Sequence, residues 1–434
     1  MVSEWREYRI GEIAEIVGGS TPSTADPSNF NGEIPWLTPK DLSGPHERYV
    51  SRGERNLSRK GLESCSAQQL PVGTVLLTSR APIGYVAIAK TPLATNQGFR
   101  NLIPKPGFDS DFLYYWLRAH DEELQRHASG STFQELTGSA LAQIRIRLPL
   151  LAEQRAIAHI LGTLDDKIEL NRRMNETLEE MARAIFKDWF VDFGPTRAKM
   201  EGRAPYLSSD IWSLFPDRLV DSELGEIPEG WKIVPLASLI EVNPPEQLKR
   251  GMPAPYLNMA SIPTTGPNPE PYVVREFSGS GVRFRNGDAL LARITPCLEN
   301  GKSAFVQNLP EDQVGWGSTE FIVLRSRPPL PKAVAYLIAR DPAFRANAIR
   351  SMTGTSGRQR VSSDAIAAYP LPQPESDTLW SHLNNLIAPM FERIAANGRE
   401  NQTLVATRDL LLPKLISGEL RVKDAERFLR ERGL

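Results

Sequence analysis

The sequence predicts an α+β fold. Two similar mixed α/β domains are separated by a pair of long antiparallel coiled-coil helices, and the whole is a pseudo-two-fold internal repeat. Three observations support this. Residues 151–190 and 380–415 both carry apolar residues at heptad spacing. The two segments match at a constant offset of 226 residues. Each follows a stretch of short apolar runs broken by Pro and Gly, so the chain is a tandem duplication.

The first long helix is expected over residues 151–190, where Gly162 is the only break and Pro is absent. At about 1.5 Å per residue, such a helix is roughly 60 Å long. A helix of this length cannot bury its apolar seam inside a small domain, so it needs a second long helix. Its a and d positions are Gln154, Ile157, Leu161, Leu164, Ile168, Asn171, Asn175, Leu178, Ala182, Ile185 and Trp189.

The second long helix is expected over residues 380–415, and IAANGRENQTL in it corresponds to IELNRRMNETL in the first. Its pattern is weaker, because Gly398 and Pro413 lie within it and Arg408 occupies a core position. How far its last turns stay paired is therefore open. Its a and d positions are Trp380, Leu383, Ile387, Met390, Ile394, Asn397, Asn401, Leu404, Arg408, Leu411 and Leu415.

Four asparagines fall at core positions of the helix pair. Duplicated halves tend to pack about a two-fold axis, which makes the helices antiparallel. An a position then meets a d position, so Asn171 is expected to face Asn401, and Asn175 to face Asn397. Buried asparagines are costly unless they pair, so these pairs would fix the register. The alternative is that the asparagines face solvent on loosely packed helices.

The globular parts repeat the same plan. A hairpin is predicted around residues 79–84, and GDALLARITPCLENGKSAFVQN is its counterpart in the second half. Surface residues of the matching pieces differ, either because the copies read different targets or through neutral drift. The predicted divisions are a first domain at 1–150, a helical spacer at 151–193, a linker at 194–228, a second domain at 229–375, a second helical spacer at 376–420 and a tail at 421–434.

Composition limits the function. The formal net charge is −1, so a nucleic-acid role would rest on local basic faces. The cysteines, Cys65 and Cys297, lie one in each half and are expected to be free thiols in a reducing cytoplasm. The sequence has neither a run of about 20 apolar residues nor a signal peptide, so a cytoplasmic protein with no membrane contact is expected.

No catalytic motif is complete. Asn243 to Glu246, NPPE, resembles the Asn-Pro-Pro-aromatic motif of amino-methyltransferases, but Glu replaces the aromatic residue and no Gly-rich cofactor loop precedes it. Gly301-Lys302-Ser303 resembles the end of a phosphate-binding loop, but Pro296 stands at the first Gly. The five histidines lack metal-ligand spacing. The chain is predicted to be non-catalytic and to hold no metal.

Three segments resemble a known family, the specificity subunits of type I restriction–modification systems. They are EQRAIAHILGTLDDKIELNRRMNETLEEMARAIFKDWFVDF, SELGEIPEGW and GSTFQELTGSALAQIRIRLPLLAEQ. The resemblance covers nearly the whole chain in the right order. It implies that each globular half is a target recognition domain that reads one part of a bipartite double-stranded DNA sequence. It also implies that the helices set the spacer between the two parts.

The same resemblance implies partners and cofactors. The helices would dock two modification subunits, which bind S-adenosylmethionine and methylate adenine. Two restriction subunits would add ATP- and Mg²⁺-dependent translocation and cleavage, so this chain itself needs no cofactor. The aromatic end of the first helix suggests a surface that awaits a partner. It contains Phe186, Trp189, Phe190 and Phe193.

Candidate DNA-contacting residues are Arg, Lys, Gln and Ser side chains in or beside loops, because Arg prefers guanine and Gln or Asn prefers adenine. The loops at 130–132 and 354–356 could also donate backbone N–H groups to phosphate. For each residue, a solvated surface position is the alternative. The candidates are Lys40, Ser79, Arg80, Gln97 and Arg100 in the first half, and Arg293, Lys302, Arg358, Gln359 and Arg360 in the second.

Two alternative functions predict different sequence features. A two-headed coiled-coil adaptor without a DNA role would lack aligned basic faces on its two heads. A self-sufficient methyltransferase would need a cofactor motif that the sequence does not contain.

Overall fold

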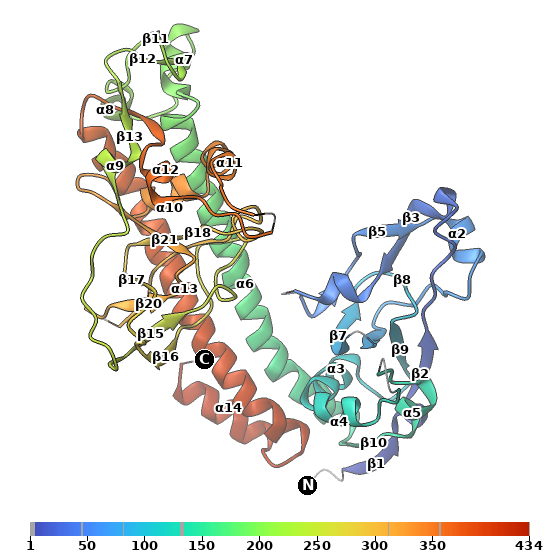
Figure 1. The fold of residues 1–434 in the computed structure, drawn as a ribbon. Coiled ribbons are helices and arrows are strands. Elements are labelled where there is room, and N and C mark those ends of the chain that lie inside the picture. Colours follow the sequence, from blue (N-terminus) through green and yellow to red (C-terminus); the bar gives the residue numbers. More distant parts are fainter. Residues whose placement is uncertain are drawn as a thin grey trace. The chain divides into compact units, whose positions relative to one another are not determined.

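A computed structural model describes residues 5–44, 47–80, 82–130, 134–310, 312–355 and 357–433. The chain forms two compact units (Figure 1). Unit 1 comprises residues 1–169 and 403–434, and unit 2 comprises residues 170–402. Both long helices pass from one unit into the other, so each globular part packs on a segment of both helices. The helical regions are therefore no separate domain.

Unit 1 contains three sheets. The largest has the strand order β2-β9-β6-β7-β4, the second has the order β5-β3-β8, and β1 pairs with β10. The strands are β1 (Arg6–Arg9), β2 (Ala14–Gly18), β3 (Phe30–Leu37), β4 (Tyr49–Val50), β5 (Arg55–Leu57), β6 (Val75–Ser79), β7 (Ile83–Ala89), β8 (Ala94–Thr95), β9 (Phe99–Pro104) and β10 (Arg145–Leu148). The short helices are α1 (Ile10–Ile13), α2 (Arg59–Glu63), α3 (Ser110–Ala119), α4 (Asp121–Arg126) and α5 (Gly138–Gln143), with 3-10 turns η1 (Pro27–Asn29) and η2 (Pro39–Leu42).

Unit 2 has four sheets. Two are four-stranded, with orders β14-β21-β18-β19 and β16-β15-β20-β17, and β13–β22 and β11–β12 are two-stranded. The strands are β11 (Leu219–Ser222), β12 (Gly225–Pro228), β13 (Lys232–Pro235), β14 (Ile240–Val242), β15 (Pro253–Leu257), β16 (Val273–Glu276), β17 (Val282–Phe284), β18 (Ala289–Ala292), β19 (Ser303–Phe305), β20 (Gly315–Gly317), β21 (Phe321–Ser326) and β22 (Pro370–Gln373). Its short helices are α7 (Gly194–Met200), α8 (Ser209–Trp212), α9 (Leu236–Leu239), α10 (Val334–Ala339), α11 (Pro342–Arg350) and α12 (Ser363–Ala367).

Strand order confirms the predicted internal repeat. In each copy of the repeat an early strand pairs with the last strand before a long helix, β1 with β10 in unit 1 and β13 with β22 in unit 2. The order β2-β9-β6-β7 in unit 1 matches β14-β21-β18-β19 in unit 2, and the predicted hairpins are the antiparallel pairs β6–β7 and β18–β19. A parallel pair in the second sheet is also repeated, as β3–β8 and β15–β20.

The two predicted long helices are α6 (Leu151–Phe190) and α13 (Thr378–Ile416). Gly162 in α6 allows close approach, because a Cβ there would lie 2.2 Å from Nη1 of Arg48. The helix α13 continues through Pro413 and ends at Ile416. Two residues later, Gly418 has a φ of 77° and donates its N–H to the carbonyl of Leu415. Such a left-handed glycine is a common helix terminator.

The segment predicted as a linker, 194–228, is folded. It holds α7, α8 and the β11–β12 hairpin. Phe215 and Ile227 in it are buried in the core of unit 2 with Phe193, just before it. The prediction missed this because its apolar residues are too widely spaced to show a period, yet each is large enough to fill space beside the end of α6.

The C-terminal residues form helix α14 (Val422–Glu431), which belongs to unit 1. Ala425 is fully buried there, and Val422, Phe428 and Leu429 pack against the same core. Within the described ranges, no helix is both long and apolar enough to cross a membrane.

Candidate nucleic-acid interface

In unit 1, three chain segments converge where β6 ends, β9 begins and the loop before α5 returns. The N–H of Ser79 bonds the carbonyl of Gly98 at 2.8 Å, and the N–H of Leu136 bonds the carbonyl of Ser79 at 2.9 Å. These backbone bonds continue the sheet beyond its named strands. They bring Arg80, Arg100 and Glu135 together.

These three charged residues form one cluster. Nη2 of Arg100 lies 2.7 Å from Oε1 of Glu135, while Nη1 of Arg80 lies 3.9 Å from Oε2. Nη1 of Arg100 also donates to the carbonyl of Phe99 at 2.9 Å. The side chain of Arg80 is 38% exposed and that of Arg100 only 19%. Arg100 is thus clamped, and Arg80 is the more accessible cation.

Unit 2 has the equivalent convergence. The N–H of Arg293, directly after β18, bonds the carbonyl of Glu320 at 3.0 Å, and the N–H of Val361 bonds the carbonyl of Arg293 at 3.0 Å. The guanidinium of Arg360 donates to both oxygens of Glu320, with Nη2 at 2.7 Å from Oε1. These charge-assisted bonds hold the pKa of Glu320 below its usual range.

Arg293 supplies the second cation of this cluster. Its charge also lowers the pKa of Glu320, after the hydrogen bonds from Arg360. Its Nε is buried and has no hydrogen-bond partner within the part of the chain that the structure describes. Each unit therefore carries one Arg–Glu–Arg cluster: Arg80, Arg100 and Glu135 in unit 1, and Arg293, Arg360 and Glu320 in unit 2.

The two clusters lie at matching places but are built differently. The returning loop supplies Glu135 in unit 1 and Arg360 in unit 2. Both residues lie two positions before the N-cap residue of a short helix. The side chains of these N-caps, Thr137 and Ser362, accept the backbone N–H groups of Ala140 and Ala365. The returning loop therefore supplies the acidic side chain of the ion pair in unit 1 and the basic side chain in unit 2, where Glu320 directly precedes β21.

Ser79 needs a correction. The sequence places it in or beside a loop, and it is indeed the last residue of β6, but its side chain is fully buried and its hydroxyl donates to the carbonyl of Gly98 at 3.2 Å. A side chain that is used inside the sheet cannot face DNA, so we remove Ser79 from the candidate contacts.

The other candidate residues differ in how exposed their side chains are and in whether those side chains already have a hydrogen-bond or ion-pair partner. Lys40 is 78% exposed and pairs with Glu54, and Gln97 is exposed beside the Thr21 hydroxyl. Lys302 donates to the carbonyl of Met259 at 2.9 Å, and Arg358 is exposed.

Gln359 is partly buried, and its carbonyl accepts the N–H of Thr295. In the loops predicted to bind phosphate through the backbone, Ser131, Thr132 and Ser356 lie outside the described residues.

Across the helix pair, the four core asparagines are hydrogen-bonded in two pairs, both within unit 2. Nδ2 of Asn171 donates to Oδ1 of Asn401 at 2.9 Å, and Nδ2 of Asn397 donates to Oδ1 of Asn175 at 2.8 Å. Residue numbers rise along α6 as they fall along α13, so the helices are antiparallel. Asn171, Asn175 and Asn397 are buried.

Comparison with known proteins places this fold in a family. The model of the type I restriction modification DNA specificity domain matches residues 2–180. The specificity subunit of the type I restriction enzyme MjaIX of Methanocaldococcus jannaschii is 36% identical over 441 residues, covering 97% of this chain and 94% of that protein. The chain belongs to the type I restriction–modification specificity subunits. As a specificity subunit it is non-catalytic, and catalysis lies in partner subunits.

Further relatives agree. The specificity subunit of the type I restriction enzyme HindI of Haemophilus influenzae is 22% identical over 503 residues, covering 96% of this chain and all of that protein (100%). The crystal structure of the type I restriction–modification S subunit from M. genitalium shares the fold, with a TM-score of 0.55, 16% identity and coverage of 95% of this chain and 96% of that chain.

The specificity subunit carries two functional carboxylates on α6 that sequence reasoning missed, the largely buried Asp165 and the buried Glu179. In unit 1, Asp165 accepts from Tyr115 at 2.6 Å and from Nη1 of Arg408 at 2.7 Å. In unit 2, Glu179 accepts from Tyr336 at 2.7 Å and faces Arg340 at 3.4 Å. Each carboxylate thus ties the helix to the unit around it. An arginine at a core position, Arg408, was the signal that an acidic partner must lie opposite.

The aromatic end of α6 is buried by the subunit's own residues. The rings of Phe190 and Trp380 stack 4.2 Å apart with 2° between their planes, and Trp189 meets Phe215 edge-on. Phe186, Trp189, Phe190 and Phe193 all rank among the buried core residues. The expectation that these rings await a partner is therefore wrong, because the folded segment after α6 covers them.

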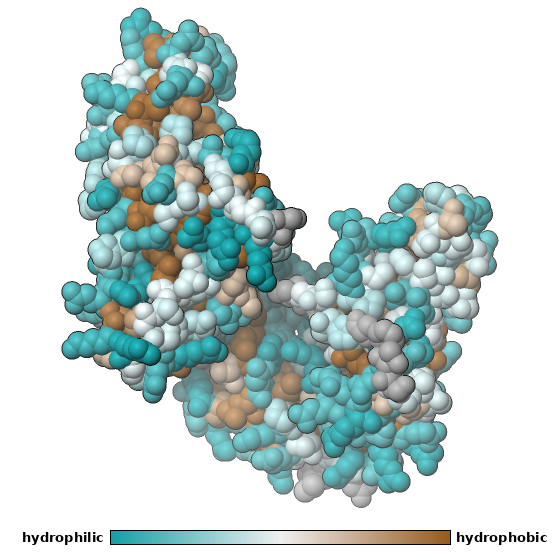
Figure 2. All heavy atoms as spheres, in the orientation of Figure 1, coloured by the Kyte–Doolittle hydropathy of each residue, from teal (hydrophilic) through white to brown (hydrophobic). Residues whose placement is uncertain are grey.

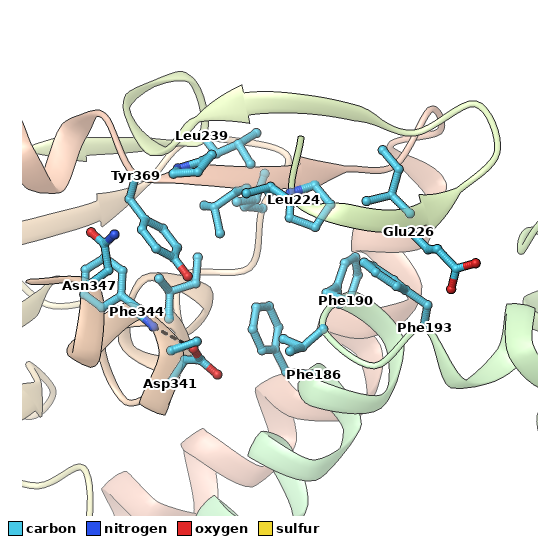
Figure 3. Close-up of a pocket in the computed structure, with 18 of the residues that line it drawn as sticks. Phe186, Phe190, Phe193, Leu224, Glu226, Leu239, Asp341, Phe344, Asn347 and Tyr369 are labelled. Carbon is cyan, nitrogen blue, oxygen red and sulfur yellow. Dashed lines mark hydrogen bonds between the residues drawn. The ribbon is translucent and has the colours of Figure 1, made fainter. Parts of the chain in front are cut away.

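A cavity of about 370 Å³ lies beside this aromatic end in unit 2. Phe186 of α6 lines one side, and Phe344 and Tyr369 line the other (Figure 3). Val191 and Leu224 also line it and are 38% and 45% exposed. Figure 2 shows hydrophobic residues at the surface around α7 and the β11–β12 hairpin.

Within the described ranges, no group of three His, Cys, Asp or Glu side chains is arranged to hold a metal ion. Cys65 and Cys297 are free thiols.

Proposed function

We propose that this specificity subunit reads a bipartite double-stranded DNA target. Each unit recognises one block of bases, and the paired helices set the length of the gap between the blocks. The observation that carries this proposal is the Arg–Glu–Arg cluster at equivalent loop junctions of both units. A cluster with two cations and one anion keeps a local positive charge in a chain whose formal net charge is −1. Arginine is also the side chain best suited to read guanine.

The surroundings of the two clusters support different targets for the two units. In unit 1 the nearby candidates are Gln97 and Arg80, whereas in unit 2 they are Arg358, Gln359 and Lys302. Because donor and acceptor patterns differ among base pairs in the major groove, different side chains at one scaffold position select different bases. Lys40 is exposed and suits a phosphate contact rather than base reading.

The helix pair serves as the spacer in this proposal. A spacer of fixed length needs one register between its two helices. The asparagine pairs Asn171–Asn401 and Asn175–Asn397 disfavour a shifted register, because a buried amide would then lose its hydrogen-bond partner. Two readers on such a spacer suit two stretches of major groove about one helical turn, roughly 34 Å, apart.

We further propose that the helices dock two modification subunits, which bind S-adenosylmethionine and methylate adenine. Two restriction subunits, dependent on ATP and Mg²⁺, complete the complex. An exposed apolar stripe on α6 supports this docking: Leu170 is 54%, Met174 39% and Met181 47% exposed. Their spacings of four and seven residues place them on one face of the helix. The partner subunits would also supply positive charge to neutralise DNA phosphates, because this chain, with a net charge of −1, supplies little of it.

Selection from a random duplex DNA library tests the proposal. The chain, co-expressed with its modification subunit, should enrich two short blocks separated by a fixed stretch of arbitrary bases. Replacing residues 229–375 by the corresponding domain of a relative should change one block and keep the other. Absence of enrichment from an intact complex at low salt would instead favour the two-headed adaptor.

A further inference from the structure

The two arginines of each Arg–Glu–Arg cluster are in different states. In unit 1, Arg100 uses Nη2 on Glu135 and Nη1 on the carbonyl of Phe99. In unit 2, Arg360 uses Nε and Nη2 on Glu320 and Nη1 on the carbonyl of Arg358. Each of these two guanidinium groups already bonds a carboxylate and a backbone carbonyl, which leaves fewer of its five N–H donors for a bidentate contact to guanine.

The other arginine of each cluster keeps its donors. Arg80 approaches Glu135 only to 3.9 Å, which is too far for a hydrogen bond. The backbone N–H of Arg293 bonds the carbonyl of Glu320 at 3.0 Å, and its side-chain Nε has no hydrogen-bond partner within the described part of the chain. Both follow the end of equivalent central strands, β6 and β18, so both start from rigid backbone.

We propose that Glu135 and Glu320 are positioning residues for sequence recognition. Each is clamped by one arginine, Arg100 or Arg360, and holds the second arginine, Arg80 or Arg293, in place to read a base edge. The inference rests on the proposed function and assigns different roles to arginines that the sequence could not distinguish.

Two physical effects follow from the clamped glutamate. A neighbouring carboxylate restricts the guanidinium of the reader before DNA arrives, so less side-chain entropy is lost on binding. Its negative charge also opposes close approach of phosphate, which weakens non-specific binding relative to specific binding. The side chains of Glu135 and Glu320 are 33% and 26% exposed, so both carboxylates lie close enough to the surface to act on a bound DNA phosphate.

The test is the random-library selection repeated with Glu320→Gln in the full chain, co-expressed with its modification subunit. The variant should lose about ten-fold in preference at one base pair of the block read by unit 2. The block read by unit 1 should not change, and it reports in the same molecule that the chain folds and binds. Loss of one charge that repels phosphate should also steepen the salt dependence of non-specific binding, by about one phosphate contact.

Matched controls are available in both units. Glu229→Gln removes an equal charge from an exposed ion pair with Arg218 in unit 2, and should leave both blocks unchanged. Glu135→Gln should alter only the other block. Its control is Glu7→Gln, which removes the exposed partner of Arg145.

A second variant separates positioning from a general structural effect. Arg293→Gln should lose preference at the same base pair as Glu320→Gln, and the double variant should lose no more than the larger single loss. If wild-type chain enriches a bipartite target but Glu320→Gln keeps its base preference and salt dependence, the inference is overturned while the proposed function stands. If the wild-type complex enriches no target, the proposed function itself fails.

Discussion

Asn397 donates a hydrogen bond to Asn175 across the antiparallel helices α6 and α13, with 2.8 Å between Nδ2 and Oδ1. Both side chains are buried, Asn397 at 3% and Asn175 at 9% exposure. The pair is worth little as net stability, but a mismatch is expensive, because an amide left without a partner loses its hydration.

Replacing Asn397 by Leu should therefore destabilise the fold by about 1–3 kcal/mol, since it strands the amide of Asn175. The double change to Leu at both positions should recover most of that loss. Urea unfolding of the two single variants, the double variant and the wild type gives the coupling energy. Additive losses in the double variant would show that the pair does not act as a unit.

The ion pair between Asp165 and Arg408 should contribute more strongly to the integrity of unit 1. Both side chains are only 13% exposed and their atoms approach to 2.7 Å. Asp165→Ala should cost about 1–3 kcal/mol, because the largely buried Arg408 keeps only its pair with Asp409 and the hydroxyl of Tyr115 loses its acceptor. Arg145→Ala, which removes an exposed pair with Glu7, should cost less than about 1 kcal/mol. Similar losses in urea unfolding for both variants would contradict this assignment.

Acid should weaken the cluster of unit 2. The folded-state pKa of Glu320 is lowered, chiefly by its hydrogen bonds to Arg360. A carboxylate with a lowered pKa contributes stability above its unfolded pKa, and this stability is lost as pH falls through the folded pKa. The stability difference between wild type and Glu320→Gln should thus shrink from pH 7 towards pH 3. Denaturant midpoints at several pH values measure this stability difference. A difference that grows as the pH falls would contradict the predicted direction of the pH dependence.

Met174→Glu and Met181→Glu should weaken assembly with the modification subunit without unfolding the chain. Both positions are already exposed, so the new charge costs little in the free chain but would be buried without a partner in the complex. Size-exclusion chromatography of the co-expressed subunits measures assembly. Val72→Glu, at a 61% exposed position of unit 1 outside α6, is the control. Normal assembly of both variants would remove the stripe from the docking surface.

The duplication and both long helices could be predicted because their signals are periodic. A constant offset and heptad spacing do not depend on what packs nearby, and the same spacing led to the Asn171–Asn401 and Asn175–Asn397 pairs. The paired arginines and glutamates could not be predicted. Glu135 meets Arg100 only because three segments converge at the end of β6, and no local pattern in the sequence records that meeting. Arg408 could be predicted only in part. Its core position in the heptad pattern required an acidic partner, but the sequence did not show that this partner is Asp165.

Inserting one heptad into each long helix tests the central claim most directly. The insertions belong after Glu169 in α6 and after Gln402 in α13, where the two compact units divide both helices. Seven residues add about 10 Å and rotate the helix to about 20° short of two whole turns, so the inserted heptad nearly preserves the rotational phase of the helix. The account predicts that library selection returns the same two blocks with a longer gap. An unchanged gap, with both blocks still enriched, would show that the helices do not set the spacing.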